Sequence, residues 1–209
     1  MKIFFDTEFT GLHKNTSLIS IGLIDENGRT FYGEFLGYNS WQVNDWIKEN
    51  VIKNLKYKFC DNNWNNNDYD HFECVGFTYY IRECLLTWFS KYDTVELVSD
   101  VCHYDMVLFI DIFGGAFDIP HNVCASCHDI NQDIAKYLGI SEGKAFDISR
   151  EQFIDEYNKI VSEHFSENAV AHIDGDKHNS LYDARVIRVI YNIINENYIN
   201  MRAHKIQWK

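Results

Sequence analysis

Two carboxylates near the start of the chain, Asp6 and Glu8, have the spacing of a metal-binding pair. They follow a short apolar run, residues 2–5, that is typical of a buried strand. Because residues i and i+2 of a strand point to the same face, both side chains would project together. Adjacent anions repel each other unless a cation or a shared proton lies between them, and Mg²⁺ and Mn²⁺ prefer carboxylate oxygens. For this pair alone, an exposed acidic strand end is the simpler explanation. The choice between that explanation and a metal site depends on the other acidic residues of the chain.

Two further acidic segments occur where predicted strands end or predicted helices begin. Tyr104 and Asp105 open a helix after a strand, and His178 precedes Asp183 at the start of the last helix. Acidic side chains at such positions can converge on a metal ion. Five residues of a regular helix correspond to a rotation of about 140°, so we place His178 on a loop before the helix. Asp100 also lies at the strand end and is the alternative to Asp105.

Together these segments resemble the DEDDh exonuclease superfamily over nearly the whole chain. The resemblance rests on Asp6, Glu8, Thr10, Gly11, Leu12, Tyr104, Asp105, His178 and Asp183, in that order. The runs at residues 18–22 and 178–185 are similar to those of the small mycobacterial-type 3′–5′ exoribonucleases. The resemblance implies a ribonuclease H-like fold and hydrolysis of 3′-terminal phosphodiester bonds with two divalent ions, Mg²⁺ or Mn²⁺.

The resemblance also implies a role for each matching residue. Asp6 matches the acid that bridges both ions, and Glu8, Asp105 and Asp183 match the other acidic ligands. His178 matches the residue that orients and deprotonates the attacking water. These residue types suit the chemistry, since carboxylates hold two hard cations about 3.5–4 Å apart. A neutral imidazole with a pKa of about 6.5 can accept a proton at cellular pH.

The resemblance also implies that the turn after Glu8 lies beside the terminal nucleotide. Its backbone could then bind the 3′-hydroxyl, and Leu12 could pack on the terminal base. Arg185, about one helical turn from the predicted site, is the candidate for a phosphate contact. The predicted substrate-binding residues are Phe9, Thr10, Gly11, Leu12, Tyr104 and Arg185.

The elements that must position these residues predict an α/β fold. Residues 2–5, 18–24 and 29–36 read as an antiparallel three-strand meander, and residues 94–99 as a fourth strand. Helices are predicted at residues 41–55, 72–92, 104–113, 150–164 and 179–198. Residues 61–70 are predicted as a polar loop and residues 122–125 as a short segment after Pro120. We expect one domain over residues 1–209, with a ribonuclease H-like mixed central sheet flanked by helices.

The charge and apolar content of the chain limit the binding partners that can be expected. The formal net charge of −12 argues against a protein that coats duplex nucleic acid through many phosphate contacts. Four carboxylates facing two divalent cations sum to zero charge, so the metals would supply the positive charge that phosphate needs. No apolar stretch approaches the roughly 18 residues of a membrane helix, and no signal peptide is evident. We therefore expect a cytoplasmic protein without membrane contact.

Two other signals have competing explanations. Cys124 and Cys127 supply half of the ligands of a zinc site, to which His121 or His128 could add a third, whereas reduced thiols are expected in a chain without a secretion signal. Trp64 could stack on a base or anchor its loop on the core.

The sequence thus predicts a metal-dependent 3′–5′ exoribonuclease that acts on single-stranded or short RNA ends. The choice of RNA rests on the subgroup resemblance. The alternatives are a 3′–5′ exonuclease that trims or proofreads single-stranded DNA, a catalytically silent nucleic-acid-binding module, and a nuclease-fold protein that binds another protein. A homodimer is compatible with the resemblance, since related small enzymes often pair.

Overall fold

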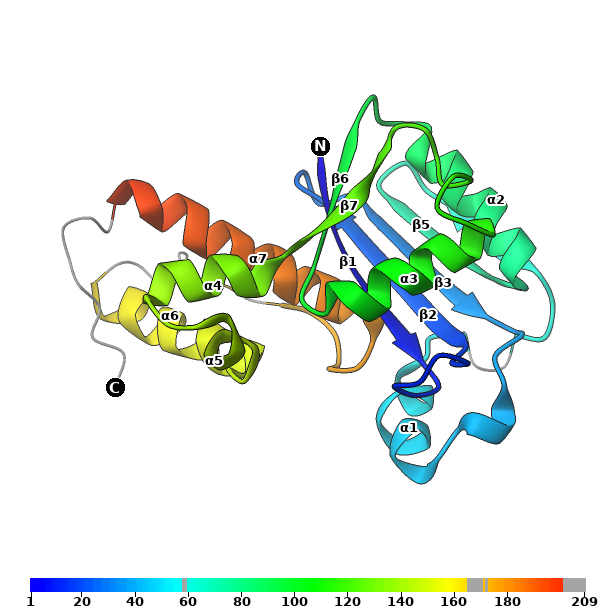
Figure 1. The fold of residues 1–209 in the computed structure, drawn as a ribbon, viewed down its shortest axis with the longest axis horizontal. Coiled ribbons are helices and arrows are strands. Elements are labelled where there is room, and N and C mark those ends of the chain that lie inside the picture. The colour runs from blue at the N-terminus through cyan, green and yellow to red at the C-terminus, as the bar shows by residue number, and fades with distance from the viewer. Residues whose placement is uncertain (58–59, 165–170, 172, 201–209) are drawn as a thin grey trace.

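A mixed sheet forms the centre of the molecule (Figure 1). The computed structural model describes residues 1–57, 60–164, 171 and 173–200. Within these residues the sheet has seven strands in the order β4-β5-β3-β2-β1-β6-β7. The strands are β1 (Lys2–Phe9), β2 (Leu18–Asp25), β3 (Thr30–Phe35), β4 (Trp64–Asn67), β5 (His71–Gly76), β6 (Val95–Ser99) and β7 (Val123–Asp129).

The predicted antiparallel meander is confirmed. Strand β1 pairs antiparallel with β2, and β2 pairs antiparallel with β3. Parallel pairs extend the meander on both sides, β1 with β6 and β6 with β7 on one side and β3 with β5 on the other. Strand β1 continues through Phe9, so Asp6 and Glu8 lie on the strand itself.

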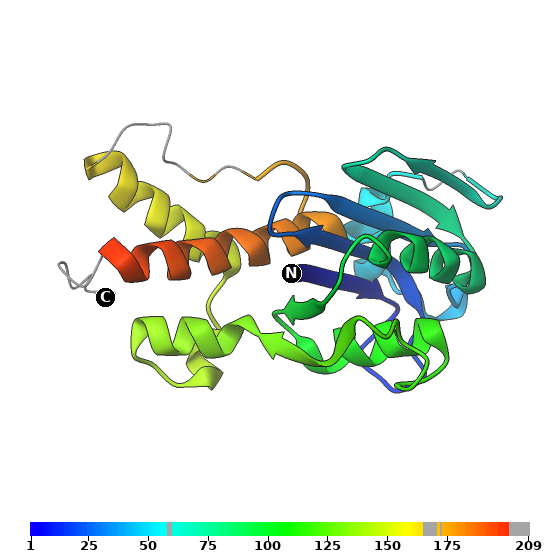
Figure 2. The same cartoon turned by 90° about the horizontal axis from the view of Figure 1, so that it is seen from above.

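Helices cover both faces of the sheet, as the sequence predicts. Because side chains of a strand alternate between faces, Ile3 and Phe5 pack toward α2 (Thr78–Phe89) and α3 (Cys102–Phe113). Phe4 packs on the opposite face in a second core with the C-terminal helices. These are α4 (Ile130–Leu138), α5 (Glu142–Phe146), α6 (Arg150–His164) and α7 (Ser180–Asn200). They gather at one end of the molecule, and α7 runs back across β1 and β2 (Figure 2).

Four segments differ from the prediction. The single helix expected at residues 41–55 is divided into two 3-10 turns and a short helix, α1 (Asp45–Asn50). The division occurs because Asn44 caps a new helix start, its side chain accepting a hydrogen bond from Ile47 N at 2.9 Å. The polar loop expected at residues 61–70 contains edge strand β4.

The long helix expected at residues 72–92 is wrong in its first part. Strand β5 occupies His71–Gly76, and α2 begins only at Thr78. Pairing of β5 with β3, a contact between distant parts of the chain, overrides the apolar spacing that favours a helix. The short segment expected at residues 122–125 is likewise part of the longer strand β7.

A close contact at Gly22 fixes the start of α7 on the sheet. A Cβ atom at Gly22 would lie 2.2 Å from Leu181 N and 2.4 Å from Leu181 Cα, which no side chain can tolerate. Beside this contact the buried hydroxyls of Ser20 and Ser180 are 2.9 Å apart. Gly22 is the register partner of Asp6 on β1. Glycine at this position therefore lets the first turns of α7 approach the acidic end of β1.

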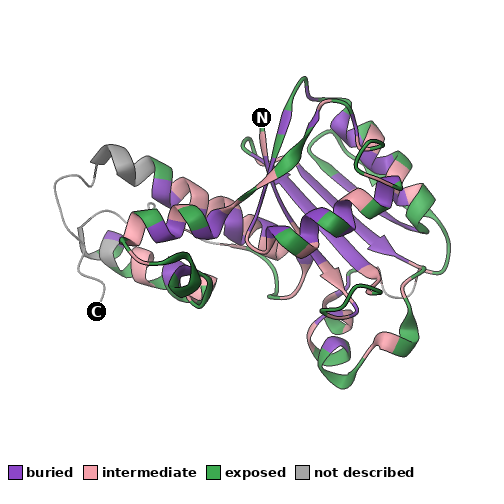
Figure 3. Cartoon of the chain, viewed as in Figure 1, coloured by how far each residue is buried: buried purple, intermediate pink, exposed green. Residues whose placement is uncertain are grey.

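The central strands are buried along most of their length, and β1 becomes partly accessible toward its carboxyl end (Figure 3). Of the helices that the structure describes, none is both long and apolar enough to cross a membrane.

Candidate active site

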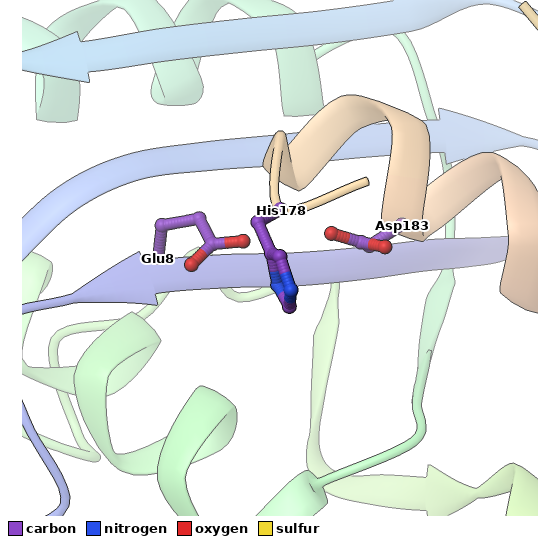
Figure 4. Close-up of side chains that lie close together, drawn as sticks. All are labelled: Glu8, His178 and Asp183. Carbon is purple, nitrogen blue, oxygen red and sulfur yellow. The ribbon is translucent and has the colours of Figure 1, made fainter. Parts of the chain in front are cut away.

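The five predicted catalytic residues lie together at the carboxyl end of β1. The potential ligand atoms of Glu8, His178 and Asp183 are within 4.8 Å of one another. Those of Asp6, Asp105 and Asp100 form a second group with the same spacing. Figure 4 shows Glu8 on β1, Asp183 on α7, and His178 on the segment that leads into α7. Since Asp6 and Glu8 share one face of β1, the two groups are adjacent.

Asp105 is buried in the first turn of α3 and is tied to β1. Its carboxylate accepts hydrogen bonds from Thr7 N at 3.2 Å and from Thr7 Oγ1 at 2.6 Å. The hydroxyl of Ser99, at the end of β6, donates a third. Thr7 separates Asp6 from Glu8, so these bonds hold Asp105 at the acidic pair.

Asp100, the alternative to Asp105, lies in the same group, but its negative charge is balanced by a basic side chain. Its carboxylate forms an ion pair with Arg150, with an Nε–Oδ2 distance of 3.2 Å. Asp105 has only neutral donors, so its charge is left to interact with a cation. This difference favours Asp105 as the metal ligand, and that choice stays a prediction.

The acids raise one another's pKa values. Burial and the nearby Asp105, Asp183 and Glu8 carboxylates hold the pKa of Asp6 well above its usual range. Burial, with repulsion from Asp183 and Asp105, raises the pKa of Glu8 to about 9. Burial is also the first cause that raises the pKa values of Asp105 and Asp183 to about 7. A set of hard oxygen donors that cannot all ionise alone fits divalent cations such as Mg²⁺ or Mn²⁺.

These pKa values predict that the metal-free protein loses stability as pH rises. The acids have pKa values near 4 when unfolded and near 7 to 9 in the fold, so the folded state binds more protons between those limits. Their contribution to the free energy of unfolding is complete below about pH 4. It is lost as pH passes through about 7 to 9, and the loss is a few kcal/mol.

Unfolding of the metal-free protein, followed between pH 5 and 9, measures this effect. Adding Mg²⁺ should restore stability, and by more at higher pH. Glu8→Gln, which removes one of the titrating groups, should flatten the pH dependence. A metal-free stability that is constant or rises over this interval contradicts the assignment of these acids as one repelling cluster.

His178 lies on a loop just before α7, as predicted. Its backbone has a φ of 63°, in the left-handed region. Its ring meets the Trp46 ring edge to face, with centroids 5.0 Å apart. Burial, and then the Lys177 charge, lower the pKa of His178 from its ordinary value, so the imidazole is neutral near pH 7 and can accept a proton.

The acids open into a cavity of about 730 Å³. Segments distant in sequence line it, including Leu12 after β1, Trp46 on α1 and Phe146 at the end of α5. Arg150 and Lys177 supply its basic side chains. Sequence reasoning missed these residues, except for Leu12. Trp46 is 55% exposed, and no spacing rule distinguishes such a tryptophan from a core one.

The predicted substrate residues divide into two sets. Phe9, Gly11 and Leu12 line the cavity. Thr10 is buried beneath the turn, where its hydroxyl donates to Gln42 Oε1 at 2.6 Å and accepts from Ser17 N at 2.9 Å. Tyr104 stacks on Phe9 with ring centroids 5.6 Å apart, and it supports the cavity wall without lining it.

The phosphate contact predicted for Arg185 is not supported by the structure. Two helical positions separate Arg185 from Asp183, a rotation of about 200°, so the two side chains leave opposite sides of α7. The guanidinium instead donates from Nη1 to Asp174 O at 2.9 Å. Arg185 is not among the residues that line the cavity.

The Cys124 and Cys127 pair does not converge on a common point. Residues three apart on a strand point to opposite faces, and Cys124 is exposed while Cys127 is partly buried. Cys127 Sγ lies 2.7 Å from Cys102 Sγ, and His128 pairs with Asp133 at 2.6 Å. The groups of described residues that could hold a metal do not include these cysteines. Trp64 packs on Tyr57, with ring centroids 4.8 Å apart, and does not line the cavity.

Comparisons with known proteins find relatives among 3′–5′ exoribonucleases and nuclease folds. No family model matches the sequence. The chain is 24% identical over 132 residues to the 3′-5′ exoribonuclease Rv2179c of Mycobacterium tuberculosis strain H37Rv, covering 63% of this chain and 73% of the relative. The same values hold for the 3′-5′ exoribonuclease MT2234.1 of strain CDC 1551.

Two solved structures share the fold. The nuclease domain of 3′hExo, a DEDDh family member bound to rAMP, has a TM-score of 0.59 at 12% identity, covering 94% of this chain and 92% of that one. The Mg²⁺- and Mn²⁺-bound form of S. pombe Pop2p also has a TM-score of 0.59, at 16% identity, covering 95% and 84%. These likenesses confirm the predicted ribonuclease H-like fold class. The chain thus resembles the DEDDh exonucleases in fold and motif order, and the mycobacterial 3′–5′ exoribonucleases in sequence.

Proposed function

We propose that the protein is a metal-dependent 3′–5′ exoribonuclease that acts on single-stranded or short RNA ends. One observation carries the proposal: acids from β1, α3 and α7 meet a neutral histidine at a single cavity. This is the residue set that two-metal phosphodiester hydrolysis requires. A catalytically silent module would have no need to retain it.

Asp6, Glu8, Asp105 and Asp183 would hold two Mg²⁺ or Mn²⁺ ions, since their potential ligand atoms form two adjacent groups. When bound, such a pair stabilises the attacking and leaving oxygens of an in-line displacement. The raised pKa values of these acids mean that metal uptake should release protons. The metal-bound form of Pop2p supports this assignment by likeness of fold.

The chain's own residues supply positioning and the proton acceptor. His178 accepts a proton from the attacking water, whose oxygen bonds to phosphorus as the bond to the 3′-oxygen of the preceding nucleotide breaks. The released 3′-oxygen takes up a proton from solvent, so the products are a 5′-nucleotide and a chain shortened by one residue with a free 3′-hydroxyl. Leu12 and Trp46 offer apolar surface to the terminal base at the edge of the cavity.

RNA is favoured over DNA because the curated relatives are named exoribonucleases. The alternative within catalysis is a DNA exonuclease of the trimming or proofreading type. A nucleic-acid-binding module or a protein-binding nuclease fold are the alternatives without turnover.

Oligonucleotides labelled at the 5′ or the 3′ end separate these functions. RNA and DNA of the same sequence are incubated with Mg²⁺ or Mn²⁺, and in parallel with EDTA. Stepwise shortening of 5′-labelled RNA, and early release of the 3′ label as a mononucleotide, support the proposal if EDTA stops both. Equal rates on DNA overturn the ribonuclease assignment. Binding without shortening overturns catalysis.

Trp46→Ala is expected to weaken substrate binding by removing an exposed ring from the cavity edge. Stacking of a base on an aromatic side chain contributes about 1–3 kcal/mol, so KM should rise roughly 5-fold to 150-fold. Steady-state kinetics on a short RNA measure the change. Trp41→Ala is the matched control, because Trp41 is 97% exposed on the same segment and does not line the cavity. Equal effects of the two substitutions contradict a stacking role for Trp46.

Three expectations complete the proposal. The single domain over residues 1–209, the cytoplasmic location and the homodimer stay predictions. Light scattering of the purified protein at assay concentration tests the homodimer directly.

A further inference from the structure

His178 has a backbone conformation that must be held by its surroundings. Among the described residues it is the only non-glycine with a positive φ. The left-handed region is unfavourable for residues with a Cβ atom, and such conformations persist where neighbouring contacts over-determine them. The contacts on both sides of His178 therefore decide where its ring lies.

Asn54 holds the residue before His178. Its Nδ2 group donates one hydrogen bond to Lys177 O at 2.7 Å and a second to Asn50 O at 2.7 Å. Both hydrogens of the amide are thus used. One binds its own helical segment, and the other binds the histidine loop, residues 177–179. The loop is fixed to the end of the second 3-10 turn, Ile52–Asn54, across 123 residues of sequence.

Asn179 holds the residue after His178. Its Nδ2 group donates to Asn54 O and to Tyr32 Oη, both at 3.1 Å. Its Oδ1 atom accepts from Leu181 N at 3.2 Å and from Tyr182 N at 3.4 Å. One end of this amide therefore caps α7, and the other binds Asn54 and the sheet.

The far end of this network lies in the core. Tyr32 and Glu34 are buried on β3, and Tyr32 Oη donates to Glu34 Oε1 at 2.8 Å. Glu34 also accepts hydrogen bonds from Lys56 N at 2.6 Å and Tyr57 N at 3.0 Å. The chain just after Asn54 is thus anchored to the same buried carboxylate. Sheet, 3-10 turn and histidine loop form one connected set of hydrogen bonds.

We propose that Asn54 and Asn179 are positioning residues that hold His178 in its left-handed conformation against the acidic cluster. The inference deepens the proposed function and rests on His178 accepting the proton from water. Neither asparagine lines the cavity, so both act through the histidine and not on the substrate. Their loss should lower the catalytic rate and spare substrate and metal binding.

Asn54→Ala tests the proposal, with Asn50→Ala as the matched control. Both asparagines are partly buried and both donate to a backbone carbonyl four residues earlier, but only Asn54 also reaches Lys177 O. Asn54→Ala should lower kcat between about 10-fold and 100-fold with KM changed less than about threefold, because a small misplacement of a catalytic group has effects of this size. Equal kcat values for the two variants overturn the proposal.

Asn179→Ser separates capping of α7 from holding the loop. Serine retains a side-chain oxygen that can cap the helix, adds no charge and removes the Nδ2 donor. It should lower kcat as Asn54→Ala does, with an unfolding temperature close to that of the parent protein. A kcat equal to that of the parent shows that the amide donor is not needed, and overturns the role of Asn179.

A double-mutant cycle with His178→Ala decides whether Asn54 acts through the histidine. In that background Asn54→Ala should change the remaining rate by less than about twofold, because the positioned group is already gone. The same fold-loss in both backgrounds overturns the proposal. Hydrogen exchange of the amides at residues 177–179 provides a readout that needs no turnover and should be faster in Asn54→Ala than in Asn50→Ala. If the parent protein degrades no RNA, the proposed function fails, while unchanged exchange overturns the holding role separately.

Discussion

Asp6→Asn is expected to lower RNA degradation by about 10⁴-fold or more. Burial and the Asp105, Asp183 and Glu8 carboxylates raise the pKa of Asp6, so charges from both ligand groups act on it. Asparagine keeps the shape and removes the anionic charge that would help to hold the cations. Loss of metal stabilisation of several kcal/mol corresponds to this factor, at about 1.4 kcal/mol per tenfold change in rate.

Single-turnover degradation of a 5′-labelled RNA by excess enzyme measures the loss. Asp111→Asn is the charge control, because Asp111 is exposed near the far end of the helix that carries Asp105. The metal-free Asp6→Asn protein should be at least as stable as its parent at pH 8, since the substitution relieves repulsion among buried acids. Retention of more than about a tenth of the parent rate would contradict the two-metal assignment.

His178→Ala is expected to lower kcat by about 10²-fold to 10⁴-fold, the usual contribution of a general base. Divalent-cation binding should be largely kept, because the four carboxylates remain. The parent kcat should rise with pH as His178 loses its proton, through a pKa below the ordinary histidine value, because burial disfavours the charged imidazole. Above that pKa the neutral ring is present and the rate should level off. The variant should lack this rising limb.

Rates measured between pH 5 and 8 at saturating Mg²⁺ test the assignment. His128→Ala is the control, because His128 is an exposed histidine of β7 that pairs with Asp133 away from the cavity. An unchanged kcat in His178→Ala removes this residue as the base. A rising limb that persists in the variant assigns the titration to another group.

Three features could not be predicted from local sequence patterns: the contacts of the histidine loop, the divided helix at residues 41–55 and strand β5. The apolar spacing at residues 72–76 suits a helix, but pairing with β3 makes a strand. Asn44 divides the predicted helix, and the shortened α1 carries Trp46 to the cavity. Asn54 gives no signal in the sequence, because its partner Lys177 lies 123 residues away. Distance along a helix does not give the direction of a side chain, so the hydrogen bond of Arg185 to Asp174 O could not be predicted from the sequence.

By itself the sequence determined the identity and order of the acids, the shared face of Asp6 and Glu8, the loop position of His178 and the meander that begins the sheet. These follow from short-range periodicity, which any strand or helix obeys wherever it packs. Only the tertiary structure decided that Asp100 is paired with Arg150 while Asp105 is not, and that Trp46 and Phe146 face the cavity. It also brought Asn54 to the Lys177 carbonyl and to the Asn179 amide, on either side of the histidine. Such contacts join residues far apart in the chain, so their geometry exists only once the sheet and the helices that cover it have packed.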